Sequence, residues 1–465
     1  MPARVRLSRA AAVAAACAAA ATACPSPAEA KTKAPALTEL RCVPKTKAAC
    51  KTSPHVAVGA QVQFRGQRLK RGMRVSFRWS KGALATKLSL TKVGWVARVP
   101  AGTATGTIGV TVSDSAGRRS NRKTVTVVAE APQVKPAARP TEPLPSAFAG
   151  NGMWIWYLKS SDDGDLDAIA ARAQAAGVST VFVKSADATT AWTQFNADLV
   201  TQLHARGLKV CAWQFVYGDK PAGEAAAAAA SIAAGADCFV IDAETHYEGR
   251  YAAAQTYMTA LRAAAGPAYP IGLTSFPYVD YHPKLPFSVF LGPGGAQANL
   301  PQVYWADIGA SVDAVSAKTV ANNRIYEVPI APLGQTYGDV SAADIRRFRA
   351  IWAGYGSPGL SWWSWQATPQ KLWPVLNEPA PATVVPADPG WPALEEKSSG
   401  DQVIWLQMHL AAFDPTQQID GKFAAGTTAT LKAFQAAKGL PATGETDALT
   451  WQRLLELTPV AGQWN

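Results

Sequence analysis

The chain has 465 residues, of which 48% are hydrophobic and 17% are charged. Such a chain can bury sizeable cores and is long enough for about two to four domains, which excludes a globally disordered protein. Only one apolar run, near the N-terminus, could cross a membrane, which excludes a multi-span membrane protein. The formal charge of +12 is uneven, because residues 31–130 carry 20 Lys and Arg against 3 Asp and Glu.

Residues 1–30 have the features of a secretory signal peptide. Three arginines precede an apolar run at 10–23, and Ala28-Glu29-Ala30 fits an A-x-A cleavage site. We therefore expect export and a mature chain that begins near Lys31, so that the protein is secreted. The alternatives are a retained N-terminal anchor and a lipoprotein signal that ends at Cys24.

Four cysteines follow this segment, and an even number in an exported chain favours disulfides. Cys42 and Cys50 would close a short loop, and we expect them to pair. Cys211 and Cys238 lie in two consecutive predicted strands, where they either pair or serve as small core residues. No C-x-x-C occurs, so the sequence does not support a structural zinc site.

The module at 36–130 alternates apolar and polar residues in short stretches, which predicts strands at 56–69, 74–79, 87–99, 106–114 and 123–128. Short strands without a long helix indicate a β-sandwich, and the module resembles an immunoglobulin-like cell-surface domain. Its basic charge is compatible with nucleic acid, but export favours anionic wall polymers or phosphate-rich lipids. The alternative is a solvated basic surface without a specific partner.

Two Pro-rich stretches, 131–146 and 377–394, are predicted linkers on either side of a module at 147–376. Strand and helix patterns alternate eight times in this module, which predicts a (β/α)8 TIM barrel. A doubly wound open sheet is the alternative, and it is disfavoured because no G-x-G-x-x-G follows the first strand. The predicted strands are 153–158, 180–185, 209–215, 238–243, 270–275, 301–306, 325–330 and 359–365.

Strand four leads into Asp242-Ala243-Glu244, at the barrel end where reactive groups gather. Residues i and i+2 of a strand share a face, so Asp242 and Glu244 should point into the barrel mouth together. The acetamide of an N-acetylated sugar can attack the anomeric carbon itself if one acid protonates the leaving oxygen and one carboxylate orients the acetamide. We assign Glu244 as the acid and Asp242 as the orienting group. The alternative is a salt-bridged or helix-capping pair without chemistry.

Aromatic and polar residues at other strand ends favour a saccharide groove, because sugar rings stack their C–H faces on aromatic rings. Only one face of each strand can line the mouth, so some of these residues must pack against the helices instead. The candidate substrate-binding residues are Trp154, Trp156, Lys184, Asp187, Gln214, Tyr217, Tyr304, Trp305, Gln335, Trp363, Trp365 and Gln366.

Asp242-Ala243-Glu244 and Trp365-Gln366 resemble the family 25 glycoside hydrolases, the lysozyme-type muramidases. The resemblance implies hydrolysis of an N-acetylated wall glycan, as by a muramidase or a glucosaminidase. That family usually has an Asp on strand one, whereas residues 152–157 contain none. Another carboxylate, such as Asp187 or Asp307, would then have to assist, or the barrel is a sugar-binding relic.

Other chemistries have weaker support. A set of metal ligands could be formed by Asp242, Glu244 and His246. However, no His-based zinc motif occurs, and the five His are scattered along the chain. No G-x-S-x-G elbow is present either. We therefore expect no cofactor and no metal.

Residues 395–458 show helical spacing of apolar residues and turns rich in Gly. The module resembles the three-helix peptidoglycan-binding domain of bacterial wall enzymes, at Asp420-Gly421-x-Phe423, Phe434-Gln435, Gly439-Leu440-Pro441 and Thr450-Trp451. The resemblance implies peptidoglycan binding, and the alternative is that these residues define only a helical fold. Together the modules predict an exported cell-wall glycosidase, or a non-catalytic wall-binding scaffold with a degenerate barrel.

Overall fold

The computed structural model describes residues 33–43, 55–57, 61–92, 94–100, 102–128, 146–379 and 384–464. The predicted signal peptide, the predicted Cys42–Cys50 bond and residues 131–145 of the first predicted linker lie outside the described residues. The chain divides into two compact units, residues 1–130 and 131–465. No helix among the described residues is long and apolar enough to span a bilayer.

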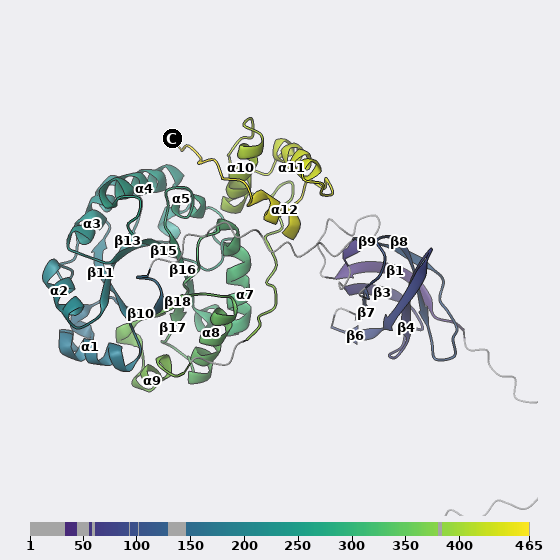
Figure 1. Ribbon diagram of the computed structural model, residues 1–465, viewed down its shortest axis with the longest axis horizontal. Coiled ribbons are helices and arrows are strands. Elements are labelled where there is room, and N and C mark those ends of the chain that lie inside the picture. Colours follow the sequence, from purple (N-terminus) through teal and green to yellow (C-terminus); the bar gives the residue numbers. More distant parts are fainter. Residues whose placement is uncertain are drawn as a thin grey trace, which may run out of the picture. The chain divides into compact units, whose positions relative to one another are not determined.

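The first unit consists of two β-sheets around one core (Figure 1). Its strands are β1 (Ala36–Val43), β2 (His55–Ala57), β3 (Gln61–Gln67), β4 (Arg74–Trp79), β5 (Gly82–Lys87), β6 (Ser89–Thr91), β7 (Gly94–Arg98), β8 (Gly106–Ser113) and β9 (Lys123–Val128). The sheets have the orders β1-β3-β7-β6 and β2-β9-β8-β4-β5, antiparallel except for β2–β9. The predicted all-β module is confirmed, while an immunoglobulin-like topology stays a prediction.

Eight parallel strands form a closed barrel in the second unit (Figure 1). They are β10 (Gly150–Ile155), β11 (Thr180–Asp187), β13 (Lys209–Val216), β14 (Cys238–Ala243), β15 (Ile271–Ser275), β16 (Ala298–Val303), β17 (Leu333–Gln335) and β18 (Gly359–Trp363). β10 pairs with both β11 and β18, which closes the ring. A short strand β12 (Thr190–Ala191) pairs antiparallel with the end of β11. The predicted barrel is thus confirmed, and the open sheet is excluded.

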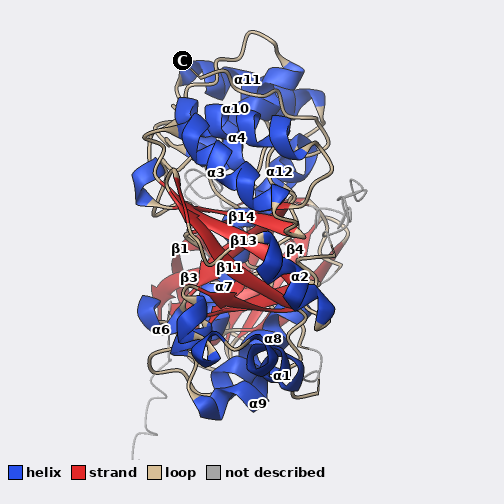
Figure 2. Ribbon diagram, turned by 90° about the vertical axis from the view of Figure 1, so that its left-hand side faces the viewer, coloured by secondary structure: helices blue, strands red, loops and turns tan. Residues whose placement is uncertain are grey.

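Helices surround the barrel and bury their apolar faces against it (Figure 2). They are α1 (Leu166–Ala175), α2 (Ala197–Ala205), α3 (Pro221–Ala233), α4 (Tyr251–Ala265), α5 (Phe287–Phe290), α6 (Trp305–Ile308), α7 (Val312–Asn323), α8 (Ala342–Gly354) and α9 (Trp373–Leu376). Side-chain caps fix several helix starts. Asp165 accepts from two backbone amides of α1, and Ser341 forms a capping box with Asp344 at α8.

Two predicted strands are misplaced. Strand six begins three residues earlier than expected, so that Trp305 starts α6 instead of ending a strand. The predicted strand at 325–330 is wrong, because residues Arg324–Tyr326 form a 3₁₀ turn and the seventh strand is β17. The apolar residues Ile325 and Tyr326 are buried for another reason, since both bond to the C-terminal helical domain.

That domain contains three helices, α10 (Asp401–Phe413), α11 (Ala425–Ala437) and α12 (Ala448–Leu454), as predicted. Two buried glutamines hold its turns. Gln407 accepts from the backbone amides of Asp420 and Gly421, and Gln435 accepts from that of Gly444. Gly421 and Gly444 both have positive φ, which suits glycine. Many residues of the sequence motif therefore serve this fold.

The helical domain is bound firmly to the barrel. The carboxylate of Asp401, which is fully buried, accepts from Ser288 N at 2.9 Å, Ser288 Oγ at 2.6 Å and Tyr326 Oη at 2.6 Å. Trp405 Nε1 donates to the carbonyl of Ile325 at 2.6 Å. Within the second predicted linker, Trp391 lies 4.0 Å from the Arg324 guanidinium. Trp391 of this predicted linker therefore packs on the barrel unit.

Cys211 and Cys238 form a disulfide inside the barrel, which decides between the two readings of these residues. They are register partners on β13 and β14, and both are fully buried. Their side chains belong to the inner core of the barrel, together with Trp154, Trp213 and Val240.

Breaking this bond is expected to lower the free energy of unfolding by about 3 kcal/mol, because it closes a loop of 27 residues in the unfolded chain. Denaturant titration with and without reductant measures the change. The Cys211→Ala/Cys238→Ala double variant is the control and should be insensitive to reductant. Equal sensitivity of both proteins would contradict the prediction.

Candidate functional site

A cavity of about 250 Å³ lies at the barrel mouth around the predicted carboxylate pair. The strands place its lining side chains, since every second residue of a strand points inward. The lining residues are Trp154, Trp156, Lys184, Trp213, Phe215, Asp242, Glu244, Thr274, Gln302, Tyr304, Leu333 and Trp363.

Asp242 and Glu244 face this cavity together, as their spacing predicted. Asp242 lies near the end of β14 and is only 6% exposed, whereas Glu244 follows the strand and is partly exposed. Gln302 on β16 bridges them, because its Nε2 lies 2.9 Å from Glu244 Oε1 and 3.4 Å from Asp242 Oδ1. Among the residues that the structure describes, no arginine or lysine forms a salt bridge with Glu244, which disfavours the salt-bridged alternative.

Burial raises the pKa of the Asp242 carboxyl well above its usual range, and the neighbouring charge of Glu244 adds to the shift. The Lys184 ammonium opposes it. The raised pKa thus belongs to Asp242, the residue that the sequence analysis assigned as the orienting group, and it favours the protonated form of this carboxyl beside Glu244.

Lys184 is enclosed by aromatic rings beside the pair. Its Nζ lies 4.9, 4.6 and 4.9 Å from the ring centroids of Trp156, Trp192 and Trp213. Asp187 Oδ2 accepts from the same ammonium at 2.6 Å, and Asp187 Oδ1 accepts from Tyr217 Oη at 3.1 Å. Asp187 is thus engaged with Lys184 and Tyr217 and does not line the cavity.

The walls of the cavity are largely aromatic. Trp154, Trp213 and Trp363 contact one another at centroid distances of 5.5 to 5.8 Å. Trp156 is 39% exposed and contacts Trp363, so it offers an open ring at the entrance. On the remaining side, burial raises the pKa of the Tyr304 hydroxyl well above its usual range, which keeps it a protonated donor.

Several predicted binding residues lie elsewhere. The Gln214 amide points to the helix layer and donates to the carbonyls of Ala188 and Glu224. Gln335 accepts from the amide of Ala306 and donates to Asp307.

The aromatic candidates at two strand ends also pack outside the cavity. Trp305 packs on Phe348, and Trp365 packs on Trp373 and donates to Asp162. Gln366 donates to the carbonyl of Tyr157.

Gln302 is the most important cavity residue that the sequence argument missed. It lies two residues before Tyr304, so the strand period placed both on one face, but the strand boundary was set too late. Trp213 could have been found in the same way, because it lies two residues after Cys211 on the same strand and therefore shares its inward face. Trp192 had none, because it follows the short β12 and reaches Lys184 only through the tertiary fold.

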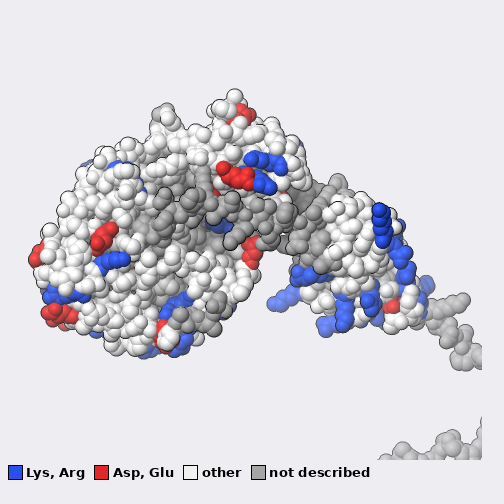
Figure 3. Space-filling view, viewed as in Figure 1, with Lys and Arg blue, Asp and Glu red and all other residues white. Residues whose placement is uncertain are grey.

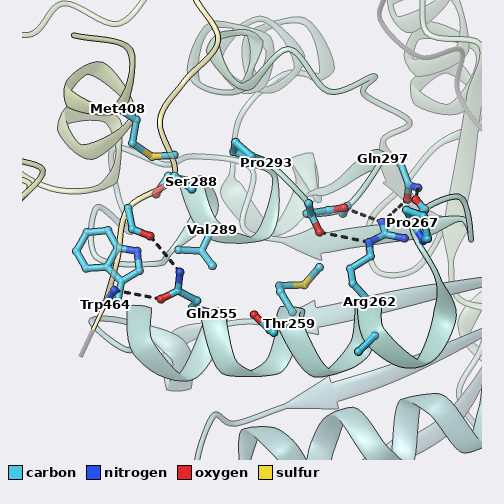
Figure 4. A pocket seen from close by; sticks show the side chains of 18 residues that line it. Gln255, Thr259, Arg262, Pro267, Ser288, Val289, Pro293, Gln297, Met408 and Trp464 are labelled. Carbon is cyan, nitrogen blue, oxygen red and sulfur yellow. Dashed lines mark hydrogen bonds between the residues drawn. The ribbon is translucent and has the colours of Figure 1, made fainter. Parts of the chain in front are cut away.

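A larger pocket of about 700 Å³ lies between α4, the loop at 292–297 and the C-terminal segment (Figure 4). Arg262 is its only charged lining residue, and the guanidinium donates to protein oxygens, including Tyr269 O at 2.7 Å and Gln297 Oε1 at 2.6 Å. No carboxylate lines this pocket. The smaller cavity at the barrel mouth, which contains the Asp242–Glu244 pair, is therefore the candidate active site.

Residues 399–454 match the family model described as a putative peptidoglycan binding domain. The match supports cell-wall glycan as a binding partner and association with the cell wall. It covers the three helices of the C-terminal domain. No curated protein matches the chain.

Solved structures with similar barrels include a class V chitinase from Pseudomonas fluorescens, with 12% identity, a TM-score of 0.39, and coverage of 49% of this chain and 98% of that one. The spore cortex-lytic enzyme SleL of Bacillus cereus has 11% identity, a TM-score of 0.39, and coverage of 51% and 76%. An endo-beta-1,4-mannanase from Thermotoga petrophila has 8% identity, a TM-score of 0.37, and coverage of 47% and 68%. At these values the likenesses say nothing about the activity of this chain.

Proposed function

We propose that this protein is an exported glycosidase that cleaves an N-acetylated glycan of the bacterial cell wall. The observation that carries the proposal is the Asp242–Glu244 pair, bridged by Gln302 and set in an aromatic-lined cavity. The peptidoglycan-binding domain supports the choice of substrate, because it would hold the barrel at the wall.

In the proposed reaction, Glu244 protonates the glycosidic oxygen while the acetamide oxygen of the sugar attacks the anomeric carbon. The bond to the leaving sugar breaks and an oxazolinium forms. Glu244 then takes a proton from the water that opens this ring, which restores the acid. Asp242, beside Glu244 in the cavity, orients the acetamide, and burial favours the protonated form of its carboxyl in the empty site. Gln302 keeps the two carboxyl groups in place.

The aromatic walls supply substrate positioning in this account. Trp156 and Trp363 would stack on sugar rings, and the Tyr304 hydroxyl would donate to the acetamide. Lys184 lines the cavity and contributes to its shape, while its ion pair with Asp187, outside the cavity, offsets its charge. Four of the predicted binding residues make contacts in the helix layer and support the barrel without lining the cavity. They are Gln214, Trp305, Gln335 and Trp365.

One observation favours a second function, that of a non-catalytic wall-binding scaffold. Among the residues that line the cavity, Asp242 and Glu244 are the only carboxylates, so none faces Glu244 from the opposite wall. β10 contributes Trp154 there and no carboxylate, whereas the family 25 enzymes usually have an Asp on strand one. A substrate-assisted reaction does not need that opposing carboxylate, which is why we prefer the enzyme.

Digestion of purified wall glycan by the full chain, with the products read by mass spectrometry, separates these functions. The glycosidase should release fragments with new reducing ends, and their masses identify the bond. Intact glycan, together with normal sedimentation of the protein with the wall, would overturn the enzymatic proposal in favour of the scaffold.

A further inference from the structure

The five-stranded sheet of the first unit presents a row of cations on its outer face. Arg74 on β4 and Lys87 on β5 are direct register partners, and both are exposed. Farther along β4, Arg78 is exposed and pairs with Gly109 of β8. The Arg122 guanidinium covers Gly109, where a side chain would meet its Nε at 2.1 Å. We call Arg74, Arg78, Lys87 and Arg122 the basic face.

This arrangement opposes folding stability. Like charges directly opposite each other on neighbouring strands destabilise a sheet. Within the described residues, no salt bridge involves any member of the basic face. The acidic residues among the described part of this unit are Glu39 and Asp114, and they pair instead with Arg41 and Arg118. Figure 3 shows the same imbalance, with many Lys and Arg and few Asp and Glu over this unit.

The shape of the basic face determines what kind of anion fits it. The residues between the cations are small, namely Ser76, Ala83, Ala85, Gly109 and Thr111, so no bulky side chain separates the cations on this face. Strands are about 4.8 Å apart and rise about 3.3 Å per residue, so Arg74 and Arg78 are about 13 Å apart along β4. Cations spaced in this way can contact successive anionic groups of an extended chain.

We propose that the basic face binds a linear polyanion of the cell wall, a polymer with repeated phosphate groups. The small residues offer no aromatic ring for stacking nucleic-acid bases and no bulky apolar side chain for insertion into a bilayer. The peptidoglycan-binding domain of the same chain supports the wall as the source. The attraction would offset the repulsion between Arg74 and Lys87, and its strength would fall as salt rises.

Binding of the full chain to long-chain inorganic polyphosphate tests the proposal by titration. The Arg74→Ser/Arg78→Ser variant should bind about tenfold or more weakly, since each lost cation removes a phosphate contact and the counterion release that accompanies it. The matched control is Arg65→Ser/Lys92→Ser, which removes equal charge from an exposed position of the other sheet and from the exposed turn after β6, and it should bind within twofold of wild type. Thermal unfolding of both variants checks that the unit remains folded.

Three outcomes would overturn the proposal. The first is no polyphosphate binding by the unaltered chain at low salt. The second is an equal loss in both variants, which would mean that only total charge matters. The third is binding to phosphatidylglycerol vesicles or duplex DNA by a chain that ignores polyphosphate.

Discussion

The Glu244→Gln variant is expected to hydrolyse wall glycan about 10²–10⁴-fold more slowly than the unaltered protein, because glutamine cannot deliver a proton to the leaving oxygen. The substitution keeps the size of the side chain and an oxygen that can accept from Gln302, which lies 2.9 Å away. Binding to insoluble glycan should be unchanged, since the C-terminal domain is untouched. Initial rates of reducing-end formation, measured beside a sedimentation assay, give both quantities.

Glu248→Gln is the matched control for this variant. Glu248 follows the same strand, but its carboxylate bonds to His282 Nδ1 at 2.7 Å and does not line the cavity. Its substitution should leave the rate within a few-fold of wild type. Equal losses in both variants would show that the loop, and not the Glu244 proton, limits the rate.

Asp401→Ala is expected to destabilise the attachment of the C-terminal domain to the barrel by about 3–5 kcal/mol. The substitution leaves the Ser288 amide, the Ser288 hydroxyl and the Tyr326 hydroxyl buried without their acceptor. Hydrogen exchange of α10 amides and thermal unfolding of the full chain would detect the loss. Asp414→Ala, at an exposed turn of the same domain, is the control and should behave as wild type.

This attachment should also depend on pH. Burial raises the pKa of Asp401 from 3.8 to about 6, so the attached state binds the proton more tightly than the free domain does. The stabilisation of the attachment that comes from this proton is therefore complete below about pH 4. It is lost as the pH rises through 6, and the loss is at most about 3 kcal/mol. Asp401→Asn should remove this slope between pH 4 and 6. An identical slope in the variant would assign the pH dependence to other groups.

The barrel was predictable because most of its strands carry uninterrupted apolar runs bounded by turns. β14 was predicted with its correct bounds, since Cys238–Ala243 is buried on both faces. The seventh strand was not predictable in this way. β17 has only three residues, and the more apolar stretch at 325–330 is buried by a different domain.

A site residue was predictable where it lay at the C-terminal end of a strand and its position in the two-residue period turned its side chain inward. Asp242 and Glu244 met both conditions, and Trp363 met them on β18. Gln214 lies close to the end of β13, but its side chain points to the opposite face of the strand from the cavity residue Trp213. Trp365 lies beyond the end of β18. The hydrogen bonds of Gln302 and the cage around Lys184 depend on neighbours far along the chain, which a single sequence does not reveal.

The most direct test of the central claim is digestion of wall glycan in water enriched in heavy oxygen, with the unaltered protein and Glu244→Gln side by side. The account predicts fragments whose new reducing ends each carry one heavy oxygen atom, because water opens the intermediate at the anomeric carbon. It also predicts that these fragments almost vanish in the variant. Labelled fragments formed at equal rates by both proteins, or no fragments from either, would contradict a glycosidase that acts through the Asp242–Glu244 pair.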